Sequence, residues 1–130
     1  MAANALLIDT DIFIDNLKRI QSACALLDSP QFDLYYSSWT RKELLTKPGL
    51  AESERKEIEA LLGRFRMLFV DAAIAEKYWI LLKKYEAQGL RQADAIVAAT
   101  AWQKNLPLLT RNQRHFRFIS EIGLAPVYRL

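Results

Sequence analysis

Short apolar segments alternate with longer amphipathic segments along this chain, and the alternation constrains the fold more than any other feature. The first short segment, Ala5–Ile8, is closed by Asp9 and indicates a buried strand. Strands that alternate with helices are typical of a parallel sheet covered on both faces, with right-handed crossovers. Further strands are predicted at residues 33–37, 67–70, 107–110 and 125–130.

Apolar residues at helical spacing predict the helices between these strands. Ile20, Ala23, Cys24 and Leu27 stand at i, i+3, i+4 and i+7 and form one stripe. Cys24 is therefore interpreted as a core residue and not as a nucleophile. Other helices are predicted at residues 11–17, from 40 to the Pro-Gly pair at 48–49, through 58–65, at 73–87 and at 91–104.

Length and composition limit the class of protein. A chain of 130 residues, 52% hydrophobic and 25% charged, is expected to form one globular domain over residues 1–130. No apolar run approaches the roughly 20 residues that a membrane span needs. The single cysteine excludes an internal disulfide, and no Cys or His cluster could bind zinc. These features predict a protein of the reducing cytoplasm that does not associate with a membrane.

The polar residues that follow the predicted strands are the candidates for a functional site. Ligands bind at the carboxyl ends of the strands in sheets of this kind. Asp9 follows the first strand, Glu43 lies one helical turn after the second, Asp94 opens an Ala-rich helix, and Asn112 follows the later strand. Carboxylates brought together repel one another unless a cation neutralises them, and hard oxygen ligands suit Mg²⁺ or Mn²⁺. This pattern predicts metal-assisted attack of water on a phosphodiester.

Each of these residues also has a structural explanation when it is taken singly. Asp9 could cap the next helix, and Glu43 could form a capping box with Thr40. Asp94 would be favoured near a helix N-terminus by the helix dipole, and Asn112 is a common turn residue. The functional interpretation therefore depends on their joint placement at one edge of the sheet.

Four segments together resemble the PIN-domain nucleases, and among them the VapC-like toxins of toxin–antitoxin pairs. In order they are LLIDTDIFID at 6–15, YSSWTRKELL at 36–45, ADAIVAATA at 93–101 and LLTRNQRHF at 108–116. The resemblance implies a three-layer α/β/α fold with about five parallel strands in the order 3-2-1-4-5. It implies that Asp9, Glu43 and Asp94 bind the metal.

The resemblance also implies supporting roles and a reaction. Asn112 takes a position that carries Asp in many members of the family, and the number of metal ions is left open between one and two. Thr10, Asp11 and Thr110 match positions that support the metal ligands. The implied activity is an Mg²⁺- or Mn²⁺-dependent endoribonuclease, in which a metal-activated water hydrolyses the RNA and leaves 5′-phosphate and 3′-hydroxyl ends. The implied partners are RNA, an antitoxin protein that holds the toxin inactive, and a second copy in a homodimer.

Basic residues near the candidate site could contact the RNA backbone. Arg111 and Arg114 follow the later strand, and Lys42 lies beside Glu43. His115, the single histidine, invites a role as a general base, but its place beside an expected buried Phe116 favours a turn. Catalysis is therefore assigned to the carboxylates and Asn112, and not to His115.

Two alternatives remain open from the sequence. A phosphoacceptor receiver domain would use Asp71 after the third strand, but it would leave Glu43 and Asp94 without a role and lacks the expected lysine after residues 108–110. A catalytically inactive PIN-like module would bind RNA or protein without cleaving it. Retention of all three carboxylates argues against the second alternative.

Overall fold

Helices and strands alternate through residues 4–130, the part of the chain that the computed structural model describes. The strands are β1 (Ala5–Ile8), β2 (Asp33–Ser37), β3 (Arg66–Leu68) and β4 (Leu108–Leu109). The α-helices are α1 (Thr10–Leu17), α2 (Gln21–Asp28), α3 (Ser38–Leu45), α4 (Glu52–Leu62), α5 (Ala72–Lys84) and α6 (Gln92–Lys104), with short 3₁₀ helices η1 (Glu86–Gln88) and η2 (Gln113–His115).

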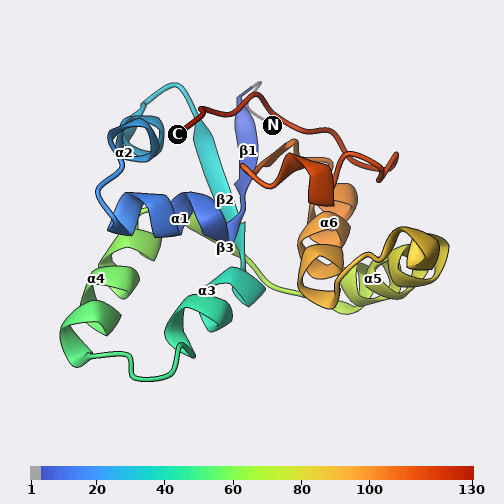
Figure 1. Ribbon diagram of the computed structural model, residues 1–130, viewed down its shortest axis with the longest axis horizontal. Helices are drawn as coiled ribbons and strands as arrows, with labels where there is room; N and C mark the ends of the chain where they lie inside the picture. Colours follow the sequence, from blue (N-terminus) through green and yellow to red (C-terminus); the bar gives the residue numbers. More distant parts are fainter. Residues whose placement is uncertain (1–3) are drawn as a thin grey trace.

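The four strands form one parallel sheet in the order β3-β2-β1-β4. Helices α1 to α4 lie on one side of this sheet and α5 and α6 on the other, so the molecule has three layers (Figure 1). The predicted α/β fold and the predicted strand order are confirmed. Because all strands run in the same direction, their carboxyl ends meet at one edge, where the candidate site residues begin.

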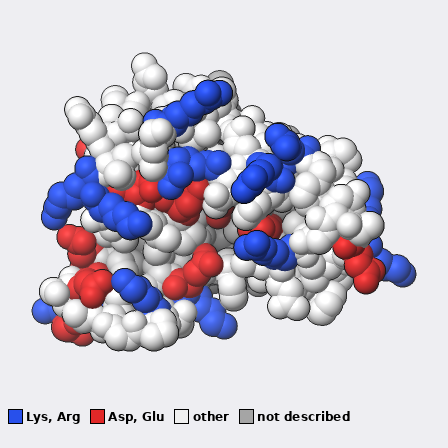
Figure 2. All heavy atoms as spheres, in the orientation of Figure 1, with Lys and Arg blue, Asp and Glu red and all other residues white. Residues whose placement is uncertain are grey.

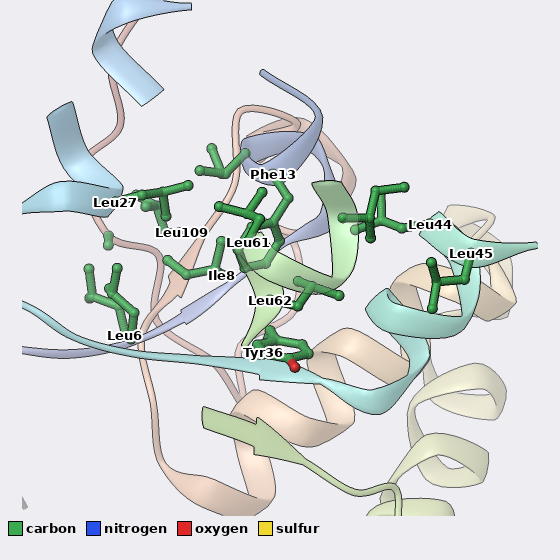
Figure 3. Close-up of a cluster of buried hydrophobic side chains, with 14 residues drawn as sticks. Leu6, Ile8, Phe13, Leu27, Tyr36, Leu44, Leu45, Leu61, Leu62 and Leu109 are labelled. Atoms are coloured by element: carbon green, nitrogen blue, oxygen red, sulfur yellow. The ribbon is translucent and has the colours of Figure 1, made fainter. Parts of the chain in front are cut away.

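Alternation of side chains along the central strand builds a separate core on each face. Leu6 and Ile8 of β1 point into a cluster with α1, α2, α3 and α4, which Figure 3 shows around Phe13 and Leu61. Ala5 and Leu7 belong to a second cluster with α5 and α6. Burial of both faces explains why β1 is a continuous apolar run and not an alternating one.

Most helix boundaries follow the predicted ones, with two informative differences. Helix α3 begins at Ser38, because the hydroxyl of Ser37 accepts a hydrogen bond from the Trp39 N–H at 3.1 Å and caps the helix. Helix α4 ends at Leu62, before the predicted Phe65. The α-helices α5 and α6 have 13 residues each, and none of the helices described for residues 4–130 is long and apolar enough to cross a membrane.

The predicted fifth strand at residues 125–130 is wrong, and an isolated bridge lies just before this segment. Leu124 pairs in parallel with Leu108, supported by a hydrogen bond from the Ala125 N–H to the Leu108 carbonyl at 2.9 Å. Pro126 has no N–H to continue the ladder. The segment beyond it packs instead against the cluster on the α1 face through Val127 and Tyr128.

Candidate active site

The four predicted catalytic residues line one cleft at the carboxyl edge of the sheet, whereas the predicted residues Lys42, Thr110, Arg111 and Arg114 do not line it. Asp9, Glu43, Asp94 and Asn112 all border this cleft, whose volume is about 650 Å³. On the face shown in Figure 2, acidic side chains gather in a central hollow and Lys and Arg side chains surround them. The sequence prediction that these residues converge is consistent with this geometry.

Asp9 occupies the point where β1 becomes α1. It is the N-cap of α1, and its Oδ1 accepts a hydrogen bond from the Thr10 N–H at 2.8 Å. Its Oδ2 accepts a hydrogen bond from the Thr110 hydroxyl at 2.8 Å. Burial raises the pKa of Asp9 to about 7, and the nearby carboxylates of Asp11 and Asp94 add to this shift against the two hydrogen bonds. The capping interpretation is confirmed, and capping leaves a charged group that a cation would stabilise.

Asp11 lies beside Asp9 in the first turn of α1. Its Oδ2 accepts hydrogen bonds from the Arg111 N–H at 2.8 Å and from the Thr110 hydroxyl at 3.4 Å. Its Oδ1 is buried and has no hydrogen-bond partner in the described residues. Burial raises the pKa of Asp11 against the effects of Arg111. A buried oxygen without a donor is a free position for a cation or for a water bound to one.

Glu43 is attached to the same helix by a side-chain hydrogen bond. Its Oε1 accepts the hydroxyl proton of Thr10 at 2.7 Å, and the same Thr10 hydroxyl lies 3.1 Å from that of the buried Thr40. The capping box considered as the structural alternative for Glu43 does not form, because Ser37 already caps α3 and both Thr40 and Glu43 contact Thr10 of α1. These contacts bring Glu43 to the edge where Asp9 lies.

Asp94 reaches the cleft from the first turn of α6, on the other side of the sheet. Burial raises the pKa of Asp94 and the charge of Glu43 raises it further, whereas His115 and Arg91 lower it. The His115 Nδ1 lies 3.5 Å from the Asp94 Oδ2. His115 therefore contacts a site carboxylate, which the sequence prediction of a plain turn did not include, while Phe116 is buried as predicted.

The loop after β4 brings Asn112 to the cleft, while Thr110 is buried behind it. The Asn112 N–H donates to the Thr110 Oγ1 at 3.1 Å, which holds the loop at the end of the strand. Thr110 is fully buried, and Asn112 is exposed at the cleft. The hydroxyl groups of Thr10 and Thr110 donate to Glu43 and Asp9, as expected of supporting residues. Asp11, the third predicted supporting residue, accepts from the loop after β4.

The donor set fits a hard divalent cation that keeps part of its water shell. Among residues 4–130, no three Asp, Glu, His or Cys side chains are arranged as a ready-made metal cage. Mg²⁺ is usually held by one or two carboxylates, several waters and substrate phosphate, so a cage is not required. The Asp11 Oδ1, which has no hydrogen-bond partner in the described residues, could bind such a cation or a water attached to it. The cation would also stabilise the charged forms of Asp9 and Asp94, whose pKa values are raised without it.

The three predicted RNA-contact residues differ in their surroundings. Arg111 forms a two-bond ion pair with Asp15, at 2.5 and 2.9 Å, so its guanidinium has a structural partner. The Lys42 ammonium lies 5.7 Å from the centre of the Trp39 ring, and Arg114 is exposed. Contact of all three with RNA stays a prediction.

Sequence reasoning missed Asp15, Tyr128 and Trp39. Asp15 is buried and pairs with Arg111 and Tyr128, and Trp39 borders the cleft. The i, i+4 spacing of Asp11 and Asp15 on one helix face was a signal that could have identified Asp15. By contrast Asp71, the residue of the receiver-domain alternative, caps α5 by accepting from the Ile74 N–H at 2.9 Å and does not line the cleft.

Comparison with known proteins identifies the class to which this fold and cleft belong. The family described as "PIN domain" matches residues 6–121. The chain therefore belongs to the PIN domain family, and the resemblance noted in the sequence is confirmed. Within that family it is similar to proteins named ribonuclease VapC. Two of them, from Mycobacterium tuberculosis, are VapC19, 33% identical over 94% of this chain and 98% of that protein, and VapC10, 30% identical over 90% of both.

Solved structures agree with this assignment. A toxin–antitoxin complex from Klebsiella pneumoniae has a chain that superposes with a TM-score of 0.79 at 26% identity, covering 96% of this chain and 99% of that one. VapBC2 from Rickettsia felis, bound to a DNA fragment from its promoter, gives a TM-score of 0.83 at 22% identity, covering 93% and 97%. The second likeness shows the fold alone.

Proposed function

We propose that this protein is the toxin ribonuclease of a toxin–antitoxin pair and that it hydrolyses RNA with Mg²⁺ or Mn²⁺. Residues 1–130 would act as one nuclease domain in the cytoplasm. The observation that carries the proposal is the convergence of Asp9, Glu43 and Asp94 on one cleft in a PIN-domain chain. The similarity to proteins named ribonuclease VapC supports RNA as the substrate.

Asp9, Glu43 and Asp94 would hold the cation, with Asn112 and Asp11 contributing oxygens at the same edge. When bound, the cation would lower the pKa of a water molecule and offset the charge that develops on the phosphate. Thr10 and Thr110 orient the carboxylates through their hydroxyl groups. Lys42 and Arg114 would attract the RNA backbone, and one carboxylate would accept the proton of the attacking water.

An antitoxin protein is the proposed partner, and the cleft offers it an extension lined by both apolar and charged side chains. Beyond the carboxylates the cleft continues between α1, α3 and α4, where its lining includes Leu17, Leu44 and Ile58. Chains similar in structure to this one occur in solved toxin–antitoxin complexes. An antitoxin segment in this extension would cover the carboxylates and block access of RNA. We also propose that the protein forms a homodimer.

RNA cleavage by the wild-type chain and by Asp94→Asn tests the proposed function. We expect the wild type to cleave RNA only with Mg²⁺ or Mn²⁺, and Asp94→Asn to cleave at least about 100-fold more slowly, because a neutral amide binds the cation weakly. The matched control is Glu86→Gln, which neutralises an exposed carboxylate on η1. It should cleave at the wild-type rate.

Two outcomes would contradict the proposal in different ways. If Asp94→Asn cleaves as fast as the wild type, the assigned site is wrong. A wild-type protein that binds RNA tightly but cleaves none of it, with either cation, would favour the inactive PIN-like module instead.

A further inference from the structure

Asp15 is a buried carboxylate that the proposed reaction does not use. It is 3% exposed and lies on α1, one helical turn after Asp11. The Arg111 Nε and Nη2 donate to its two oxygens at 2.5 and 2.9 Å, and the Tyr128 hydroxyl donates to Oδ2 at 2.8 Å. Burial alone would raise the pKa of Asp15, but these hydrogen bonds lower it below its usual value. The lowered pKa favours the charged carboxylate, and the three hydrogen bonds fix its position.

Arg111 connects Asp15 to the metal-binding edge of the sheet. Its backbone N–H donates to Asp11 at 2.8 Å, and the preceding Thr110 hydroxyl donates to Asp9 at 2.8 Å. The Asn112 N–H then donates back to Thr110 at 3.1 Å. The loop after β4 is thus attached to consecutive turns of α1, first at the candidate metal ligands and then at Asp15.

We infer that Asp15, Arg111 and Tyr128, which we call the clasp, are positioning residues. The clasp holds the loop of Thr110 and Asn112 against Asp9 in a geometry that binds the cation. The inference rests on the proposed function, because it concerns the same metal site. None of the clasp side chains needs to touch the metal or the RNA. Tyr128 makes the segment after Pro126 part of the site, although that segment contributes no lining residue to the cleft.

The chemistry of the clasp suits positioning. The guanidinium of Arg111 is a planar fork that matches both oxygens of a carboxylate, so it fixes direction as well as distance. Groups that hydrogen-bond to metal ligands commonly change metal affinity or activity by about 10- to 100-fold when they are removed. Here the chain of contacts from Tyr128 to Asp15 to Arg111 ends on Asp11, whose second oxygen is free.

The test compares Tyr128→Phe with Tyr35→Phe. Tyr35 makes the same kind of bond, donating to Asp33 at 2.9 Å, but at the amino end of β2 and away from the cleft. We expect Tyr128→Phe to bind Mn²⁺ about tenfold more weakly in calorimetric titration, while both variants unfold at similar temperatures. It should lower kcat for RNA more than it raises KM.

Arg111→Lys tests whether Mn²⁺ affinity depends on the two-bond geometry of the clasp or only on the positive charge at residue 111. Lysine keeps the positive charge and could still contact RNA phosphate, but it lacks the planar fork that forms two parallel hydrogen bonds with Asp15. We expect Arg111→Lys to lose Mn²⁺ affinity as Tyr128→Phe does. Unchanged Mn²⁺ affinity in both variants would overturn the inference and leave the clasp a purely structural contact.

Amide hydrogen exchange keeps this test independent of the proposed activity. In Tyr128→Phe the Arg111 and Asn112 N–H groups should exchange about tenfold faster than in Tyr35→Phe, because the loop opens more often. If the wild type binds Mn²⁺ but cleaves no RNA, the proposed function fails and the clasp is still decided by Mn²⁺ affinity. If the wild type binds no Mn²⁺, or if the two variants exchange these amides at equal rates, the inference is overturned.

Discussion

Burial of Asp9 destabilises its charged carboxylate, which is the form that would bind the cation. Its pKa is raised from 3.8 in the unfolded chain to about 7 in the folded protein. Between these values the folded state holds a proton that the unfolded state has lost, so the free energy of unfolding decreases as pH rises. Below pH 3.8 the group is protonated in both states and contributes nothing. The buried carboxylate therefore lowers the free energy of unfolding of the metal-free protein above pH 3.8, and a bound cation would offset this loss.

This destabilisation predicts that Asp9→Asn stabilises the metal-free protein at alkaline pH. The amide can still accept from the Thr10 N–H and donate to the Thr110 hydroxyl, but it carries no charge. At about 1.4 kcal/mol for each unit of pKa shift, the gain at pH 8 should be a few kcal/mol, and it should vanish near pH 4. Thermal unfolding across this pH range in a chelating buffer measures it. A variant less stable than the wild type at pH 8 would show that Asp9 is not strained by its burial.

Some single-residue contacts could not be predicted from local sequence. Asp9 was predictable because it directly follows a strand, and Asn112 because it lies in the loop after one. The partner of Glu43 was not, because Thr10 lies 33 residues away and a capping box with Thr40 satisfied the local pattern. The spacing of Asp15 from Asp11 was a local signal, but the partners of Asp15 lie 96 and 113 residues further along the chain and could not be predicted.

At the level of elements, the small residues of α6 determine how Asp94 reaches the cleft. Ala95, Ala98 and Ala99 are fully buried among β1, α5 and the loops beside them. Such residues let helix and neighbours approach closely, because no long side chain stands between them. Asp94 directly precedes Ala95, so the close packing of α6 determines where the Asp94 side chain lies.

We expect Ala98→Leu to destabilise the protein by about 1–3 kcal/mol, because three extra carbons must enter a filled core. The same substitution at the exposed Ala60 of α4 should change the free energy of unfolding by less than about 0.5 kcal/mol. Urea unfolding monitored by tryptophan fluorescence gives both values. Equal free energies of unfolding for the two variants would mean that the core beside Ala98 can accept a larger side chain.

Element boundaries were predictable where a residue's own chemistry decides them. Gly89 ends its segment as predicted because it adopts a positive φ of 75°. The prediction of a strand at residues 125–130 was wrong, because apolar composition does not show whether a segment can pair with a neighbouring strand. Pro126 was the local signal against it, since proline interrupts a ladder of hydrogen bonds.

At the scale of the whole molecule, large apolar side chains are exposed on α5 and just before it. Phe69 is 69% exposed, Trp79 66% and Ile80 44%. Exposed apolar side chains of this size are typical of surfaces that another protein covers. They agree with the homodimer that we propose.

We expect Trp79→Ser to convert the dimer into a monomer, with the molar mass followed by light scattering at micromolar concentrations. Leu130→Ser is the matched control, since Leu130 is 70% exposed but lies away from α5. It should leave the dimer intact. A wild-type chain that is monomeric at all these concentrations would refute the assignment.

The strand order also determines when, during synthesis, the cleft can exist. Leu7 of the central strand pairs with Tyr35 on one side and with Leu108 on the other. Ribosomes add about 5–20 residues per second, so the first pairing becomes possible several seconds before the second. Until β4 and its loop emerge, Asp9 lacks Thr110 and the clasp lacks Arg111. Under the proposed function, RNA cleavage would therefore begin only after β4 and the loop that follows it have been synthesised.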